Sequence, residues 1–146
     1  MQNRWTPLIR AASSALCLGL LAATGAVAQK SAENSTAAGV YTLEQATRGA
    51  DVFAGMCKSC HATDQHTGPA FMKAWGGRPL SELFVYLTTK MPKNDPGSLP
   101  PEEYSQVLAY LLKLNGMPAG PTELPTDSLL MKNIRFDSAD KVRKGQ

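Results

Sequence analysis

Apolar residues recur at helical spacing in three segments of the chain, which predicts three main helices. These helices are expected over about residues 43–57, 79–90 and 101–115. Pro92 ends the second helix, because the residue before a proline is pushed out of the helical conformation, and Gly116 ends the third. The apolar positions are Ala46, Ala50, Phe53 and Met56; Leu80, Leu83, Phe84 and Leu87; and Tyr104, Val107, Leu108, Leu111 and Leu112.

Two features of the first helix indicate how it begins and what it packs against. Thr42 and Gln45 form a capping box at its start. Gly49 lies on the apolar face, where a glycine costs about 1 kcal/mol relative to alanine. Such a glycine makes sense if another helix crosses closely at that point, and Tyr110 is a candidate partner. The alternative is a glycine that is merely tolerated.

The segments between and after the helices are rich in proline, glycine and polar residues. Residues 61–77 are interpreted as a loop. Residues 92–101 hold four prolines and form a stiff loop that suits holding one residue in place. Beyond Gly116, a helical turn capped by Thr126 is expected. That part of the chain forms either a packed arm as far as Phe136 or a disordered tail, and we favour the arm.

The first 28 residues have the features of a cleaved export signal. Arg4 and Arg10 precede an apolar run over residues 11–21, and Ala26-Val27-Ala28 matches a cleavage site. The apolar run is too short to span a membrane as a mature helix. Cleavage before Gln29 and a periplasmic location are therefore expected.

The rest of the chain is the size of one domain. We expect a flexible leader over residues 29–41, the folded domain over residues 42–116, and an arm and tail over residues 117–146. The net charge is only +3, and two of the basic residues lie in the signal. This balance argues against nucleic acid or bulk anionic membrane as a partner, and no stable membrane insertion is expected after signal removal.

The run Cys57-Lys58-Ser59-Cys60-His61 is the most specific motif in the chain. It is a C-x-x-C-H sequence, to which c-type haem is attached. Two thiols at this spacing at a helix end project from one face, so each can form a thioether with one vinyl group of a single porphyrin. The following histidine is then the natural proximal ligand of the iron. A thioredoxin-like pair would need a βαβ setting, and a zinc site would need further ligands than His61 and His66.

His66 follows His61 closely in the sequence. The chain cannot easily pass to the opposite face of a haem over so short a distance. A solvent-exposed loop histidine is therefore expected at this position, with a second iron ligand as the alternative.

Residues 43–125 resemble a class I, monohaem c-type cytochrome. The resemblance rests on the helix that ends in the C-x-x-C-H run, the Gly68-Pro69 pair, the Met91-Pro92 loop and the last helix with Ala109-Tyr110. The blocks Trp75-Gly-Gly-Arg-Pro-Leu and Pro96-Gly-Ser-Leu are similar to cytochrome domains that accompany pyrroloquinoline-quinone alcohol dehydrogenases. The resemblance implies an all-α, small cytochrome c fold with about three main helices around one covalently bound haem c.

The resemblance also implies residue roles. Cys57 and Cys60 would bind the haem covalently, and His61 and Met91 would be the axial ligands of its iron. The backbone carbonyl of Pro69 would accept the Nδ1–H of His61 and fix its tautomer. A further residue, Trp75, would lie near a haem propionate, with plain core packing as the alternative.

Five methionines follow the signal, and the choice among them decides the distal ligand. Met91 follows a helix end and opens the proline-rich loop, so it is preferred. Met56 and Met72 are close in sequence to the proximal side, and Met56 is expected in the core. Met117 is the main competitor because Met117-Pro118 repeats the Met-Pro pair, whereas Met131 lies in the arm.

These residues predict a single-electron carrier rather than an enzyme. An iron with both axial positions filled does not readily bind oxygen or peroxide, and thioether sulfur raises its reduction potential. The expected partners are redox proteins, including a quinoprotein dehydrogenase and a terminal oxidase. A haem enzyme or gas sensor with a labile distal ligand is the alternative from a different class, and a fixed subunit of a larger complex is another. The stretch that would bear the haem has a mild excess of basic side chains, which indicates either an acidic docking partner or a solvated face. Its basic residues are Lys58, Lys73, Arg78, Lys90 and Lys93, and its acidic residues are Asp64, Glu82 and Asp95.

Overall fold

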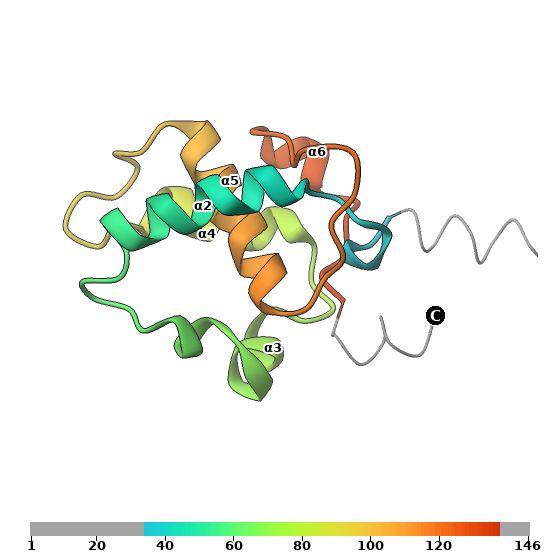
Figure 1. The fold of residues 1–146 in the computed structure, drawn as a ribbon, viewed down its shortest axis with the longest axis horizontal. Coiled ribbons are helices and arrows are strands. Elements are labelled where there is room, and N and C mark those ends of the chain that lie inside the picture. Colours follow the sequence, from blue (N-terminus) through green and yellow to red (C-terminus); the bar gives the residue numbers. More distant parts are fainter. Residues whose placement is uncertain (1–33, 138–146) are drawn as a thin grey trace, which may run out of the picture.

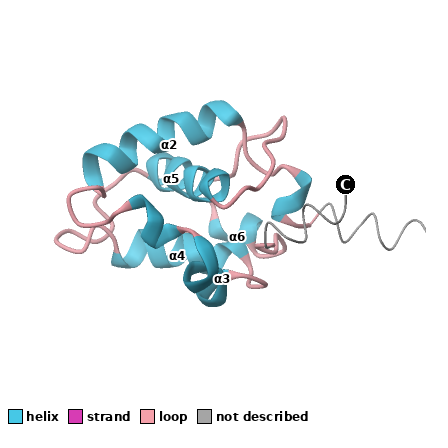
Figure 2. Ribbon diagram, turned by 60° about the horizontal axis from the view of Figure 1, so that its bottom comes forward, coloured by secondary structure: helices cyan, strands magenta, loops and turns pink. Residues whose placement is uncertain are grey.

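The structure is a computed structural model that describes residues 34–137. Within this range the regular elements are helices, and the only β-type pairings are two isolated bridges (Figure 2). This confirms the prediction of an all-α fold. The elements in chain order are η1 (Thr36–Ala38), α2 (Leu43–Met56), η2 (Thr63–His66), α3 (Gly68–Trp75), α4 (Leu80–Lys90), α5 (Pro101–Leu114) and α6 (Ser128–Met131).

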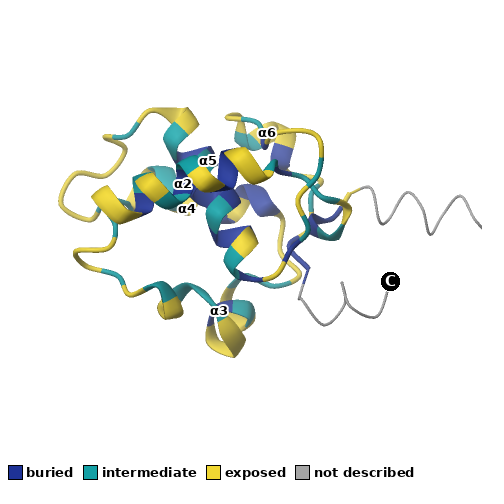
Figure 3. Cartoon of the chain, viewed as in Figure 1, coloured by how far each residue is buried: buried dark blue, intermediate teal, exposed yellow. Residues whose placement is uncertain are grey.

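Helices α2 and α5 cross each other and form the centre of the domain (Figure 1). Helix α4 packs against α5 and α6, while α3 packs against η2 and lies away from the α2–α5 pair. Buried residues gather where α2, α4 and α5 face one another (Figure 3). Within residues 34–137, no helix combines the length and apolar character needed to cross a membrane.

Gly49 is the contact point of the α2–α5 crossing. A Cβ atom at this position would lie 1.8 Å from the backbone oxygen of Gln106, so only glycine allows this approach. The predicted close crossing is therefore confirmed. The predicted partner was wrong, because the backbone of Gln106 meets Gly49 and the ring of Tyr110 packs against Phe53 at 5.5 Å.

Only one of the two hydrogen bonds of the predicted capping box is present at the start of α2. The hydroxyl of Thr42 accepts the backbone N–H of Gln45 at 3.0 Å. The Gln45 amide does not return to Thr42, because it is buried and bonds across the core. Its Nε2 donates to Ser105 and to the carbonyl of Leu124, and its Oε1 accepts the N–H of Leu124. Gln45 thus holds the C-terminal arm to α2.

The ends of α4 and α5 agree with the prediction. Helix α4 stops at Lys90, and Met91 is extended with φ −128°. Helix α5 stops at Leu114, and Gly116 has the left-handed φ of 74° that favours glycine at a helix end.

The loop predicted for residues 61–77 was wrong, because η2 and α3 lie within it. Gly68 and Pro69, which were placed in this loop, form the first turn of α3, where proline has no amide hydrogen to leave unpaired.

Residues 34–41 pack against the C-terminal arm instead of forming a flexible leader. Thr36 donates its N–H to the carbonyl of Arg135 at 2.9 Å, and Gly120 donates to the carbonyl of Tyr41 at 2.7 Å. Ser35, Thr36 and Tyr41 are buried. The expectation for residues 29–41 was therefore wrong over this part, because contacts with distant residues order it. The predicted export signal lies outside the described residues.

The arm beyond Gly116 packs on the helices at least as far as Asp137. Met117, Leu124, Met131 and Phe136 are buried. The predicted helical turn is α6, but Asp127 caps it instead of Thr126, through a carboxylate that accepts the N–H of Leu129 at 2.8 Å. Leu129 and Leu130 of this turn are exposed.

Candidate functional site

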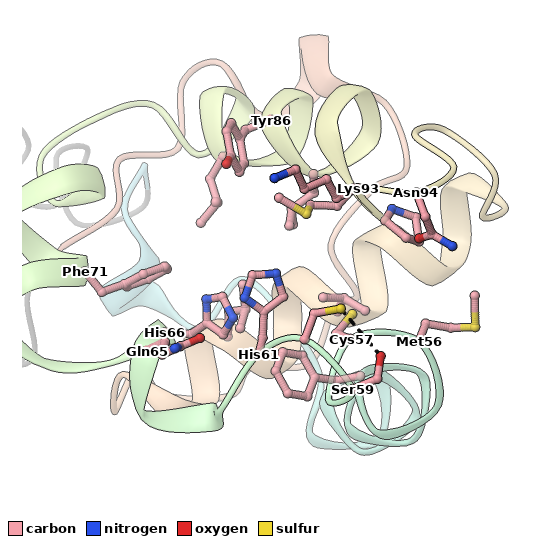
Figure 4. Close-up of a pocket in the computed structure, with 18 of the residues that line it drawn as sticks. Met56, Cys57, Ser59, His61, Gln65, His66, Phe71, Tyr86, Lys93 and Asn94 are labelled. Carbon is pink, nitrogen blue, oxygen red and sulfur yellow. Dashed lines mark hydrogen bonds between the residues drawn. The ribbon is translucent and has the colours of Figure 1, made fainter.

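A cavity of about 1020 Å³ lies between the end of α2, η2, α3, α4 and the segment that follows α4 (Figure 4). Val107 and Leu111 of α5 line it from the core side. The lining is mostly apolar, and the volume is at the upper end of the roughly 300–1,000 Å³ typical of ligand sites. The cavity can therefore hold a large, flat, mostly apolar group.

The C-x-x-C-H run forms a tight turn at the end of α2, along one side of this cavity. The carbonyl of Cys57 accepts the backbone N–H groups of Cys60 at 3.1 Å and His61 at 2.9 Å. This turn brings both thiols and the imidazole into the cavity lining. Cys57 is half-buried and Cys60 is exposed, and neither is in a disulfide. Burial raises the pKa of the Cys57 thiol above its usual value.

Met91 lines the same cavity from the segment after α4. It is the C-terminal cap of that helix, and its carbonyl accepts the phenol hydroxyl of Tyr104 at 2.7 Å. Lys93 and Asn94 reach the cavity from the same segment, opposite the turn that carries Cys57 and His61 (Figure 4). Sequence-distant residues thus place two thiols, an imidazole and a thioether around one space.

The other methionines differ in whether they line the cavity. Met117 and Met131 are buried in the core, at 3% and 0% exposure, and do not line the cavity. Met72 is partly buried beside the core and is not in the lining either. Met56 lines the cavity next to Cys57, but it is 46% exposed, so its predicted core position was wrong.

His66 is not the solvent-exposed loop residue that was predicted. Its ring lies 5.0 Å from that of His61 and makes edge contacts with Phe53 at 5.5 Å and Phe71 at 6.0 Å. The Nε2 atom is buried without a hydrogen-bond partner, and His66 lines the cavity. Burial, and then the neighbouring His61, lower its pKa, so the ring is held neutral. Sequence reasoning missed this residue because η2 was read as open loop.

Of the two further site residues that the resemblance implies, Trp75 lines the cavity and Pro69 does not. Trp75 lines the cavity from the end of α3, with Tyr86 against its ring at 5.3 Å and the Arg78 guanidinium 5.1 Å from its centre. Pro69 is exposed in the first turn of α3 and does not line the cavity. Among the hydrogen bonds of the described residues, none joins Pro69 to His61. The structure therefore brings Trp75 to the site and leaves Pro69 outside it.

Comparison with known proteins adds one finding. Residues 44–111, slightly less than half of the chain, match the family described as "Cytochrome C oxidase, cbb3-type, subunit III". The matched segment runs from α2 into α5 and includes Cys57, Cys60, His61 and Met91. The match supports a c-type cytochrome. Searches of curated proteins and of solved structures found no significant match.

The residues of the cavity fit a covalently attached haem. A c-type cytochrome needs two thiols on one edge, a histidine beside them and a mostly apolar enclosure, and all are present here. The other interpretations of the cysteine pair lose support. The part of the chain that the structure describes has no strand for a thioredoxin-like setting. It also has no group of three or more His, Cys, Asp or Glu residues that could hold a metal ion.

Proposed function

We propose that the protein is a periplasmic single-electron carrier with one covalently attached haem c, whose iron has His61 and Met91 as axial ligands. The observation that carries the proposal is that Cys57, Cys60, His61 and Met91 line one cavity from two separate segments. When bound, the haem supplies an iron that alternates between the ferrous and ferric states.

The protein residues have four tasks in this proposal. Cys57 and Cys60 hold the porphyrin through thioethers, so the group is not lost between redox partners. His61 is held close to them by its hydrogen bond to the carbonyl of Cys57. Met91 would hold the iron through its thioether from the segment after α4, and would so keep small molecules from binding it. Apolar side chains such as Phe53 and Leu83 limit water, which reduces reorganisation during electron transfer.

Export and redox partners complete the proposal. Domains of this kind are typically exported, and the first 28 residues have the pattern of a cleaved signal. We propose a dehydrogenase, including one of the quinoprotein class, as donor and a terminal oxidase as acceptor. The description of the matched family as an oxidase subunit supports the second partner.

The rim of the cavity is where a partner would approach. Lys93 is exposed and lines the cavity, so it can meet an acidic surface close to the haem edge. Arg78 contributes less, because its Nε donates to the Glu82 carboxylate at 2.6 Å. Such a docking contact would be weak and sensitive to salt.

Spectroscopy of two methionine variants tests the proposal. Met91→Ala should abolish the weak long-wavelength sulfur-to-iron band of the oxidised protein, lower the reduction potential and open the ferrous iron to carbon monoxide. Met117→Leu should change none of these, because Met117 lies in the core. The reverse pattern would move the ligand to Met117 and leave haem attachment intact. Rapid, tight carbon monoxide binding by the unsubstituted protein would instead favour a haem enzyme or gas sensor.

Mass spectrometry of the exported protein tests the remaining parts. The expected product begins at Gln29 and carries one haem. A chain that retains residues 1–28 would contradict the cleaved signal, and a second haem would contradict the single site.

A further inference from the structure

The hydroxyl of Tyr104 lies directly behind the segment that carries Met91. Tyr104 is 3% exposed at the end of the first turn of α5. Its hydroxyl donates to the carbonyl of Met91 at 2.7 Å and receives the N–H of Leu99 at a longer 3.4 Å. One buried phenol therefore touches both ends of the segment between α4 and α5.

Little else holds this segment in place. Residues 93–98 are all exposed. Its other hydrogen bonds are internal, from Asp95 to Pro92, from Gly97 to Met91 and from Ser98 to Asp95, or join its ends to the adjoining helices, from Met91 to Leu87 in α4 and from Glu103 and Tyr104 in α5 to Pro100. Among the described residues, Tyr104 is the single side chain that bonds to the backbone of residues 91–99.

We propose that Tyr104 is a positioning residue for Met91. The inference rests on the proposed role of Met91 as axial ligand. The carbonyl of Met91 is fixed to a helix whose Val107 and Leu111 line the cavity, so the direction of its side chain is set relative to that wall. Without the hydroxyl, the exposed segment can move away and take the sulfur with it. Such segments open locally long before the whole domain unfolds.

The chain supplies a matched control for this role. Tyr41 is 1% exposed, and its hydroxyl donates to the carbonyl of Met117, also at 2.7 Å. Tyr41→Phe and Tyr104→Phe therefore each remove a buried hydroxyl that donates to a methionine carbonyl and leave the ring in place, and Tyr104→Phe also loses the longer bond from Leu99. They differ in the methionine whose carbonyl accepts the bond: Met91 lines the cavity, and Met117 does not.

Imidazole is the probe, because it competes with a methionine for ferric iron. The haem-bearing protein and both variants are titrated with imidazole, and the loss of the sulfur-to-iron band gives the dissociation constant. Losing a typical hydrogen bond should let Tyr104→Phe bind imidazole about fivefold more tightly than the unsubstituted protein. Tyr41→Phe should bind it as the unsubstituted protein does. Urea unfolding should show that both variants remain folded and lose similar global stability.

The possible failures are distinguishable. A band present in all three proteins, with equal imidazole binding or an equal shift in both variants, would overturn the role of Tyr104 and leave Met91 ligation intact. A sulfur-to-iron band missing from the unsubstituted protein would overturn Met91 ligation and the positioning role together.

Discussion

The two Met-Pro pairs of this chain share one hydrogen bond to the backbone but differ in peptide geometry and in side-chain surroundings. Among the described residues, the Met91-Pro92 peptide bond is cis and the Met117-Pro118 bond is not. Met91-Pro92 follows α4, and Met117-Pro118 follows α5 after a short turn. In each pair the methionine carbonyl accepts a buried tyrosine hydroxyl at 2.7 Å. The sulfur of Met117, however, accepts the hydroxyl of Thr36 at 3.1 Å in the core, whereas Met91 lines the cavity. The same hydrogen bond therefore accompanies a core contact in one place and a candidate ligand in the other.

The difference comes from what packs opposite each pair. Met117 faces residues 34–41, where the Thr36 hydroxyl also accepts the N–H of Asp137 at 2.9 Å. Met91 faces the turn that carries Cys57 and His61 across an open space. One sulfur is thus bonded within the core, and the other methionine lines the cavity.

Removing the two thiols that would attach the haem should have the largest effect on folding, and so on the difference between the two methionine regions. Cys57→Ala combined with Cys60→Ala removes the thioethers that would hold the haem, and the mostly apolar cavity lining then faces water. A domain this small has little other apolar surface to bury in compensation. We expect the exported double variant to be largely unfolded or degraded. Cooperative thermal unfolding with native-like helix content, followed by circular dichroism, would contradict this expectation.

The α2–α5 crossing supports both methionine regions, since α5 carries Tyr104 and leads to Met117. Gly49→Ala would place a Cβ atom 1.8 Å from the backbone oxygen of Gln106. We expect a loss of about 3–5 kcal/mol in the free energy of unfolding, because neither backbone can move alone.

Gly55 provides the control for this substitution within the same helix. A Cβ atom there would meet nothing within 4 Å. Gly55→Ala should therefore raise the free energy of unfolding by about 0.5–1 kcal/mol through helix propensity. Urea unfolding of both variants measures the difference, and equal stabilities would mean that the crossing is not close.

Sequence patterns were sufficient for the parts of the fold that depend on local rules. The three main helices, the stop before Pro92 and the close approach at Gly49 follow from periodicity, proline geometry and the absence of a side chain. Helix α3 and residues 34–41 were missed. Their order depends on contacts with residues far away in the sequence, such as the pairing of Thr36 with Arg135.

The residues of the candidate site also differ in whether a local sequence pattern indicates them. Cys57, Cys60 and His61 belong to one short motif, and Met91 is marked by the proline-rich loop, so sequence reasoning could select them. Periodicity places Tyr104 on an apolar helix face but does not indicate what its hydroxyl meets, and no local pattern indicates that His66 is part of the cavity wall. Their importance comes from burial, which places the Nε2 atom of His66 in the cavity wall and the Tyr104 hydroxyl behind Met91.

Truncation of the two methionines should separate stability from ligation. Met117 is 3% exposed, so Met117→Ala should lower the free energy of unfolding by about 2–4 kcal/mol through a core cavity. The sulfur-to-iron band should remain. Met91→Ala should lose the band while retaining the core contacts around Thr36. Urea unfolding and the spectrum of the oxidised protein are measured on each variant, and a band lost from Met117→Ala would contradict the distinction.

The smallest expected effect is the pH dependence contributed by Tyr41. Burial raises the pKa of this phenol above its ordinary value of about 10. Above that pH the unfolded chain loses the phenol proton before the folded protein does, so the unfolded state binds fewer protons. The contribution of Tyr41 is therefore complete below about pH 10 and is lost as the pH rises towards its folded pKa.

Tyr41→Phe isolates this contribution from other groups that titrate in alkali. At pH 7 the variant should be less stable by about 1 kcal/mol, because the bond to the Met117 carbonyl is lost. The difference from the unsubstituted protein should shrink above about pH 10, since only the latter still has this phenol to ionise. Urea unfolding of both proteins between about pH 8 and pH 11 measures the difference. A gap that stays constant or widens over this interval would show that the Tyr41 phenol is not held protonated by the fold.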